Sequence, residues 1–303
     1  MRSSTSSGSG PRTRRRRRGA SCMSASMPAR ARAGRFLARV EGPRSGNVLL
    51  RRAQYRVADD APRAAVVVRG IVTANQRAVL RRALRDHGER LDPEAAAGLS
   101  AAEARLTDIA RRALTVDAVD GLRGLEGEAA AHYFGVFRHL IRVEDTAFVF
   151  GGRSRRPPLD RINALLSFLY ALLGHDCRSA LEAHGLDPQV GYLHADRPGR
   201  ASLALDLMEE LRPVQADRLA LSLVNRRQLG AEDFTVEEAG GVRLTEAGRK
   251  RVLVAWQERK REELRHPFLD ETMPLGLVCH AQAQMLARHL RGDLDGYPAF
   301  VWK

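Results

Sequence analysis

Cysteine is scarce in this chain of 303 residues, which holds only three. Cys22, Cys177 and Cys279 are far apart and lack the paired spacing that is typical of a zinc site. This usage argues against a disulfide-stabilised secreted protein and is typical of a reducing compartment. We therefore expect a cytoplasmic protein, and the cysteine spacing indicates no chemistry for the thiols.

Long apolar runs are missing as well. No stretch reaches the ~18 apolar residues that a membrane-spanning helix needs, so we expect no membrane association. A phosphate-binding glycine loop is also absent, because Gly121, Gly124 and Gly127 recur every three residues at the start of an expected helix, with no preceding strand. The spacing of serine, histidine and aspartate residues gives no basis for a Ser-His-Asp triad.

Acidic residues are absent from the first 33 positions, which hold nine arginines. The formal net charge is +14, so the remaining 270 residues carry only +5. Residues 1–33 are mostly Ser, Gly, Ala and Arg, and we expect them to be a disordered tail. Residues 19–26 are too short and polar for the apolar part of an export signal, whereas a basic arm that binds DNA non-specifically is possible.

The rest of the chain has helical periodicity and is long enough to bury the core of one domain. The one exception is a small hairpin, predicted at residues 234–244 around Gly240 and Gly241. The predicted helices cover residues 75–86, 100–114 with a capping box from Ser100 to Glu103, 160–173, the acid-bearing segment up to Pro213, 245–264 with Thr245 as cap, and a last helix from Pro274. The predicted fold class is therefore mainly α.

One carboxylate stands on an apolar helix face. Glu126 lies in the middle of a stripe, whereas Glu128 points about 200° away and should face solvent. A carboxylate on a core-facing stripe must be paired, protonated or bound to a metal. A buried ion pair with an arginine is as good an explanation as a metal. The stripe consists of Leu122, Ala129, Ala130, Tyr133, Phe137 and Leu140.

A second acidic group follows a histidine in residues 191–213. Asp206 and Glu209 are three residues apart on one predicted helix face, and Glu210 is at four. For Glu210 we favour an ordinary exposed acidic face, and a lone His194 would be an ordinary polar residue. Together, however, Glu126, His194 and Glu209 suit Mg²⁺ or Mn²⁺ better than a structural zinc site.

Several motifs together resemble the Cas-one family of CRISPR-associated endonucleases and integrases, in its type I-C form. The resemblance runs from about Gly34 to the last residue and implies a helical catalytic domain, with helix at residues 64–72, where Val66 to Val68 favour a strand by propensity. The motifs lie at residues 125–130, 153–158, 163–170, 194–212, 266–269, 274–277 and 287–292.

The resemblance implies a site and a reaction. The metal ligands would be Glu126, His194 and Glu209, with Asp206 as a supporting residue or alternate ligand for Mg²⁺ or Mn²⁺. The reaction would be phosphoryl transfer that joins the 3′-hydroxyl ends of a short spacer duplex to the repeat of a CRISPR array. With water as the nucleophile, the same site would be a nuclease. The implied partners are double-stranded DNA, a small Cas-two protein and a second copy of the chain.

Local arginines support a DNA partner better than the net charge does. Arg153, Arg155 and Arg156 share one loop, and Arg197 and Arg200 follow His194. Arginine guanidinium groups bind phosphate oxygens through two parallel hydrogen bonds. For any single arginine, a solvated surface charge is the alternative.

The amino terminus departs from the family, whose members begin with a β-rich domain that pairs two protomers. No alternating apolar strands precede Gly34, so most of that domain is expected to be missing and dimerisation is in doubt. We expect a tail at 1–33, a residual β-domain end and linker at 34–60, and an α-helical catalytic domain at 61–303. A truncated gene or a misread start explains this better than a functional tail.

Two alternatives to an active integrase remain. One is a catalytically inactive remnant that serves only as a basic DNA-binding module. The other is a helical transcription regulator, which ranks last because it leaves Glu126 and Glu209 unexplained.

Overall fold

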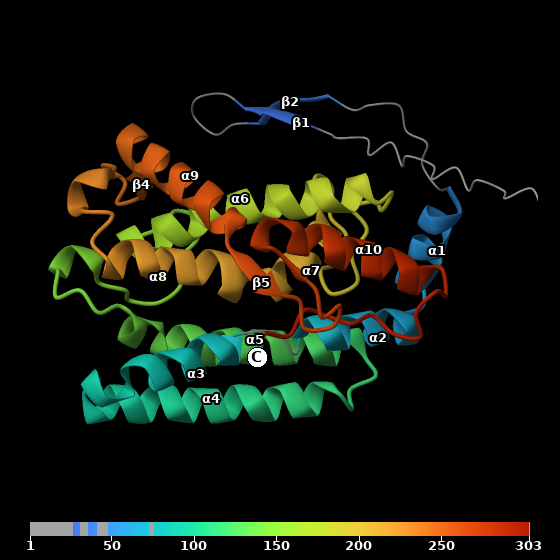
Figure 1. Cartoon of the computed structure of the whole chain (residues 1–303), viewed down its shortest axis with the longest axis horizontal. Coiled ribbons are helices and arrows are strands. Elements are labelled where there is room, and N and C mark those ends of the chain that lie inside the picture. Colours follow the sequence, from blue (N-terminus) through green and yellow to red (C-terminus); the bar gives the residue numbers. More distant parts are fainter. Residues whose placement is uncertain (1–26, 31–35, 41–47, 73–75, 303) are drawn as a thin grey trace, which may run out of the picture. The chain divides into compact units, whose positions relative to one another are not determined.

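A computed structural model describes residues 27–30, 36–40, 48–72 and 76–302 (Figure 1). The chain divides into two units, Met1–Arg44 and Ser45–Lys303. In the first, β1 (Met27–Arg30) pairs antiparallel with β2 (Phe36–Val40). The sequence before Gly34 was predicted to hold no alternating apolar strand, and Met-Pro-Ala-Arg indeed has no such alternation. A short strand forms there nevertheless, because main-chain pairing needs no apolar alternation. Residues 1–26 and 31–33 of the predicted tail lie outside the described residues.

The second unit is built of helices. Its first half contains α1 (Val48–Ala58), α2 (Ala61–Val72), α3 (Gln76–His87), α4 (Pro93–Ala113) and α5 (Val119–Val136). Helix α1 lies within residues 34–60, the segment predicted as β-domain end and linker, so part of that segment is helical. Leu50 and Val57 bury one narrow face of α1, and its many arginines mask the helical period in the sequence.

Helix α2 confirms the expectation of helix over strand for residues 64–72. Its Ala64, Ala65, Val67, Val68 and Ile71 are all buried, and the helix packs against α5 and α7 (Ser202–Leu211). Burial of this face explains why β-branched residues are tolerated here, since tertiary packing outweighs helix propensity.

Helix α4 begins earlier than predicted. Asp92 caps it by accepting a hydrogen bond from the Ala95 amide at 2.9 Å, and Pro93 occupies the first helical position. The predicted capping box at Ser100 and Glu103 is therefore wrong, because both residues lie inside the helix. An Asp-Pro pair is a strong start signal, since proline in the first turn costs no hydrogen bond.

The second half contains α6 (Arg161–Ala183), α7, α8 (Arg218–Asn225), α9 (Glu246–Arg261) and α10 (Val278–Leu290). Helix α6 extends ten residues beyond the predicted end at Leu173. Pro213 ends α7 but not the helical path, because a π-helical turn (Arg212–Asp217) leads directly into α8. Such turns are frequent at functional sites.

Small strands flank α9. β3 (Phe234–Val236) and β4 (Val242–Leu244) form the predicted hairpin, and Thr245 caps α9 by accepting from the Gly248 amide at 3.0 Å. Pro274 does not begin the last helix as predicted. It ends β6 (Thr272–Pro274), which pairs with β5 (Glu263–Arg265), and a short 3₁₀ turn separates it from α10.

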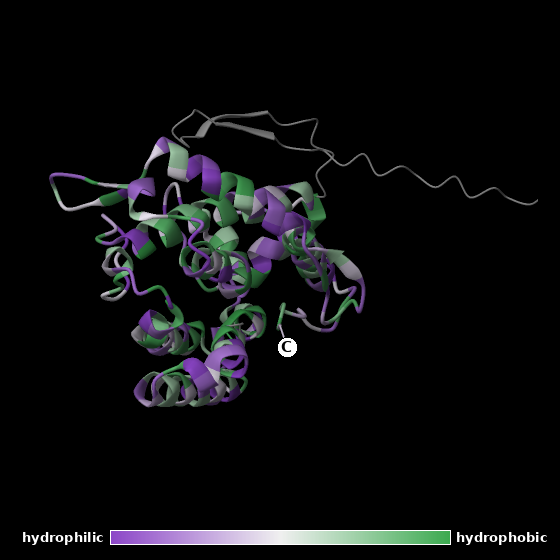
Figure 2. Cartoon of the chain, turned by 60° about the vertical axis from the view of Figure 1, so that its left-hand side comes forward, coloured by the Kyte–Doolittle hydropathy of each residue, from purple (hydrophilic) through white to green (hydrophobic). Residues whose placement is uncertain are grey.

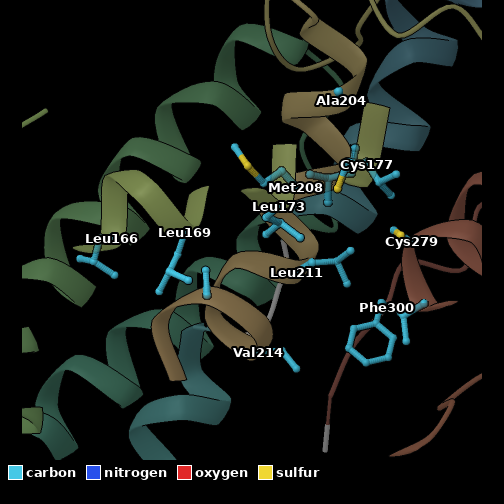
Figure 3. Packing of buried hydrophobic residues seen from close by; sticks show 14 of the residues in the cluster. Leu166, Leu169, Leu173, Cys177, Ala204, Met208, Leu211, Val214, Cys279 and Phe300 are labelled. Atoms are coloured by element: carbon cyan, nitrogen blue, oxygen red, sulfur yellow. The ribbon is translucent and has the colours of Figure 1, made fainter. Parts of the chain in front are cut away.

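Buried side chains from α6, α7 and α10 form the core behind the candidate site. Figure 3 shows Leu173 and Cys177 of α6 near Met208 of α7, with Leu211, Cys279 and Phe300 farther along the same cluster. Hydrophobic and hydrophilic residues alternate along the helices, as expected of amphipathic helices around a shared core (Figure 2). Cys177 and Cys279 are free buried thiols. Among the described residues, no helix is long and apolar enough to span a membrane.

Candidate metal centre

The loop before α7 is bound to a single carboxylate. Asp206 is completely buried and accepts hydrogen bonds from the backbone amides of Tyr192 at 2.6 Å, Leu193 at 3.0 Å and His194 at 2.9 Å. Its Oδ1 also lies 2.7 Å from His194 Nδ1. Because a carboxylate accepts, the contact to Nδ1 favours the tautomer with the proton on Nδ1, which leaves the Nε2 lone pair of His194 available as a ligand. Asp206 therefore orients the imidazole.

Glu209 lies one turn after Asp206 and is almost fully buried. His194 Nε2 is 3.9 Å from Glu209 Oε1. The Nη1 of Arg212 contacts both carboxylate oxygens, at 2.7 Å from Oε1 and 2.8 Å from Oε2. The Arg212 guanidinium also stacks over the Tyr170 ring at 4.9 Å, which fixes its position. Arg212 thus neutralises Glu209 in this arrangement.

Glu126 reaches the same place from α5 and is partly buried. Burial and the nearby Glu209 carboxylate raise the pKa of Glu126, while Arg212 and His194 oppose that shift. No arginine of the described ranges forms an ion pair with Glu126, so the alternative of a simple buried ion pair does not account for this residue. Two carboxylates and one oriented imidazole therefore converge from α5, α7 and the loop before α7.

The donor set suits a hard divalent cation. A neutral imidazole nitrogen and two carboxylates fit Mg²⁺ or Mn²⁺, and the carboxylate on the far side of His194 is the partner that metal-binding histidines usually have. Within the part of the chain that the structure describes, no group of three or more His, Cys, Asp or Glu side chains is arranged so that it could hold a metal ion. In this arrangement Arg212 binds both oxygens of Glu209, one of the three candidate donors.

A sequence profile described as "CRISPR associated protein Cas1" matches residues 27–258. The chain belongs to the Cas1 family. The match begins seven residues before Gly34, so it includes β1. The protein from Rhodospirillum rubrum named "CRISPR-associated endonuclease Cas1 2" is 64% identical over 276 residues, which cover 90% of this chain and 79% of that protein.

Solved structures share the fold of this Cas1 family member. One is titled "Casposase bound to integration product", with a TM-score of 0.74 and 22% identity over 89% of this chain and 73% of the other. A second is titled "Partial Cas6-RT-Cas1--Cas2 complex", with a TM-score of 0.72 and 25% identity over 89% of this chain and 78% of the other. The mainly α fold expected from the resemblance is confirmed.

The five arginines predicted to bind DNA differ in their surroundings. Arg155, Arg156 and Arg197 are exposed, and Arg200 is partly buried. Arg155 is close enough to Glu126 to lower its pKa. Arg153 instead turns inward: its Nη1 donates to Asn163 Oδ1 at 2.6 Å and its guanidinium lies 5.3 Å from the Tyr170 ring centroid. Arg153 thus holds the loop that carries Arg155 and Arg156.

The prediction of an exposed Glu210 is wrong. Glu210 is completely buried and accepts hydrogen bonds from Tyr297 Oη at 2.5 Å, the Phe300 amide at 2.7 Å and Gln282 Nε2 at 2.8 Å. Burial raises the pKa of Glu210 to about 7. The burial of Glu210 could not be predicted from the sequence, because its partners lie at least 72 residues away. Arg212, in contrast, could have been predicted as a partner of Glu209 from its position three residues later.

Proposed function

We propose that this chain is a metal-dependent DNA endonuclease and integrase of CRISPR adaptation. Membership of the Cas1 family and the 64% identical relative named an endonuclease support the reaction class. The observation that carries the proposal is the orientation of His194 by Asp206, with Nε2 directed to the side where Glu209 lies. Histidines that bind a metal through one ring nitrogen usually donate the other ring N–H to a carboxylate in this way.

Glu126, His194 and Glu209 would hold the ion, Mg²⁺ or Mn²⁺. When bound, it would polarise the scissile phosphate and stabilise the developing charge on the leaving oxygen. Asp206 keeps the imidazole in the required tautomer. The 3′-hydroxyl oxygen of the spacer strand forms a new bond to phosphorus, and the repeat strand leaves with its own 3′-hydroxyl. With water as the nucleophile, the same exchange is hydrolysis.

The loop arginines would position the DNA. Arg155 and Arg156 are exposed on the loop that Arg153 holds, and Arg155 is near Glu126. Guanidinium groups here would bind phosphates beside the reacting one, which contributes orientation rather than chemistry. Arg197 and Arg200 would act in the same way from the loop after His194.

The proposed partners are double-stranded spacer and repeat DNA, a Cas2-type small protein and a second copy of this chain. A neighbour with the same fold is titled as a Cas1–Cas2 complex, and another as bound to an integration product, which supports these classes of partner. The two buried free thiols agree with a cytoplasmic location.

A basic module that binds DNA without turnover is the alternative. It is favoured by one observation, the engagement of both Glu209 oxygens by Arg212. If that bond persists when divalent cations are present, the donor set stays incomplete and the chain would bind DNA only.

Strand joining of a labelled duplex into repeat DNA separates the two functions. The protein is assayed in Mn²⁺ or EDTA, with and without the Cas2-type partner, beside Glu126→Gln and His194→Ala. We expect Mn²⁺-dependent products that both variants lose while DNA binding remains. Glu128→Gln is the matched control, because Glu128 lies on the same helix but pairs with Arg112 at the surface and should leave turnover intact. Turnover by Glu126→Gln and His194→Ala would refute the assignment.

A further inference from the structure

A basic cleft lies between helices α3 and α8, which are labelled in Figure 1. Its larger part is a cavity of about 350 Å³, beside which lies a smaller hollow of about 90 Å³. The two are parts of one cleft, since Val79, Arg82 and Arg218 line both. We call this feature the α3–α8 cleft. None of Glu126, His194, Glu209 and Arg212 lines either part, so it is a different place from the candidate metal centre.

Arginines dominate the lining of the α3–α8 cleft. The smaller hollow is lined by five of them and by no carboxylate. The larger part adds two more arginines and two histidines, and its one acid is Asp86, which Arg82 and Arg85 already bind at 3.1 and 3.0 Å. The seven arginines are Arg77, Arg81, Arg82, Arg85, Arg142, Arg218 and Arg226.

Four of these arginines have no acidic partner among the residues that the structure describes. Arg81 binds Glu103 at 2.5 Å, but no carboxylate of the described residues lies within ion-pair distance of the other four. These are Arg77, Arg142, Arg218 and Arg226. Surface arginines can stay solvated at little cost, yet a concave cluster of one sign concentrates positive potential and attracts an anionic ligand.

Arg218 is a partly buried member of the cluster. Its guanidinium lies 4.5 Å from the Trp302 ring centroid, and burial together with Arg259 and Arg82 lowers the pKa of Arg218 to about 10. A half-buried cation among other cations reduces the stability of the fold. A bound anion would remove that unfavourable interaction.

The spacing of the arginines indicates the shape of the anion. Arg77, Arg81 and Arg85 recur every four residues on α3, so they form one row along the helix. Eight residues of helix rise about 12 Å, which is too long for one small anion. Arg142 and Arg226 extend the positive charge beyond the row into the larger part of the cleft. A linear polyanion with regularly repeated charges matches this layout.

We propose that the α3–α8 cleft binds the phosphate backbone of a DNA strand, as a contact separate from the metal centre. The choice of DNA among linear polyanions rests on the proposed function, in which DNA is the substrate. The cleft would hold a segment of the bound DNA away from the reacting phosphate. Its arginines contribute affinity that is independent of sequence and sensitive to salt.

Charge reversal in the cleft tests the proposal. Arg142 and Arg226 are exposed, so the double variant Arg142→Glu with Arg226→Glu should fold normally. Fluorescence anisotropy measures its affinity for a labelled single strand and for a duplex between about 50 and 200 mM salt. We expect weaker binding and a slope of log affinity against log salt that is smaller by about two, one unit for each lost phosphate contact. The form of DNA whose affinity falls more in the variant, single strand or duplex, is the form that the cleft binds.

The control is Arg288→Glu paired with Arg111→Glu, which makes the same change of charge at exposed positions outside the cleft. An unchanged affinity and slope in the cleft variant, or an equal loss in the control pair, would overturn the proposal. Polyglutamate of similar length serves as a second probe. If it binds wild type as tightly as DNA and loses affinity in parallel, the cleft is a site for an acidic protein and not for DNA.

Failure of the cleft and failure of the proposed function give different results. Glu126→Gln should bind DNA with the wild-type salt slope although it lacks turnover. If wild type performs no strand joining but the cleft variant still lowers the slope, the enzyme assignment fails and the cleft stands. If strand joining occurs and the slope is unchanged, only the cleft proposal is lost.

Discussion

Arg212→Met should destabilise the protein in the absence of metal and make it unusually responsive to Mn²⁺. Arg212 contacts both Glu209 oxygens at 2.7 and 2.8 Å, and it also offsets the charge of Glu126. Methionine retains most of the apolar stem over Tyr170 but removes the charge. The variant therefore leaves Glu209 without its ion-pair partner and removes one of the groups that offset the charge of Glu126.

The size of the effect follows from the burial of the pair. The Arg212 and Glu209 side chains are 17% and 7% exposed. Breaking a buried pair costs about 3–5 kcal/mol in the free energy of unfolding, and we take the lower figure because both side chains retain some solvent contact. For a unit of this size each kcal/mol lowers Tm by about 2–4 °C, so the expected loss is about 6–12 °C.

Thermal unfolding followed in EDTA and in Mn²⁺ measures both parts of the prediction. Mn²⁺ should raise the Tm of Arg212→Met more than that of wild type, because a cation takes over the role of the guanidinium. Arg112→Met is the matched control: Arg112 binds Glu128 with two bonds of 3.1 Å at the exposed surface, and its loss should cost at most about 1 kcal/mol. If Arg212→Met has the same Tm as wild type in EDTA, or if Mn²⁺ raises both Tm values equally, Arg212 does not take the place of a cation beside Glu209.

Three further predictions concern the surroundings of the site. Asp206→Asn should lower Mn²⁺ affinity or turnover about 10–100-fold with DNA binding unchanged, because His194 loses its orienting carboxylate; wild-type affinity and rate would contradict this. Gly191→Ala should lower both Tm and turnover, since a Cβ there would lie 2.8 Å from Ser202 backbone carbon; full activity would show that the loop adjusts. Burial raises the pKa of Glu210 from 4.5 to about 7, so its contribution to stability is greatest below the unfolded-state pKa and is lost as pH rises through 7. Glu210→Gln should therefore flatten Tm against pH between about 5 and 7.5, and an unchanged slope would assign the pH dependence to other groups.

The ligand candidates could be predicted from the sequence because they are polar residues at positions where packing would favour apolar ones, or because they occur in an unusual combination. Glu126 interrupts an apolar stripe, and the structure confirms that this face turns inward with Leu122 and Tyr133 buried beside it. His194 and Glu209 were meaningful only in combination, since neither residue type alone is unusual at its position. The structure brings all three into one electrostatic cluster.

Residues that act through distant partners could not be predicted. Glu210 follows Glu209 directly, yet it has different partners and is buried by a carboxyl-terminal segment about 90 residues away. Arg153 looked like a phosphate ligand but binds Asn163 and the Tyr170 ring. The helical periodicity of apolar residues predicts which face of a helix is buried, but it does not predict which remote segment covers that face.

Element boundaries were missed where local signals compete. Ser100 and Glu103 have the spacing of a capping box, but the Asp92–Pro93 start lies upstream and one continuous helix passes through both. Pro213 marks the end of the acid-bearing helix α7 as predicted, but a π-helical turn continues the helical path past it. In both cases packing of the whole segment outweighs a single local preference.

Whether Glu126, His194 and Glu209 form a metal centre can be measured by the binding of Mn²⁺ to the metal-free protein. Electron paramagnetic resonance measures free Mn²⁺ as the ion is titrated into wild type, Glu126→Gln, His194→Ala and Glu128→Gln. We expect one ion per chain in wild type and in Glu128→Gln, with affinity strongly reduced in the two site variants. Equal binding by all four proteins, or none by wild type, would contradict a metal centre formed by Glu126, His194 and Glu209.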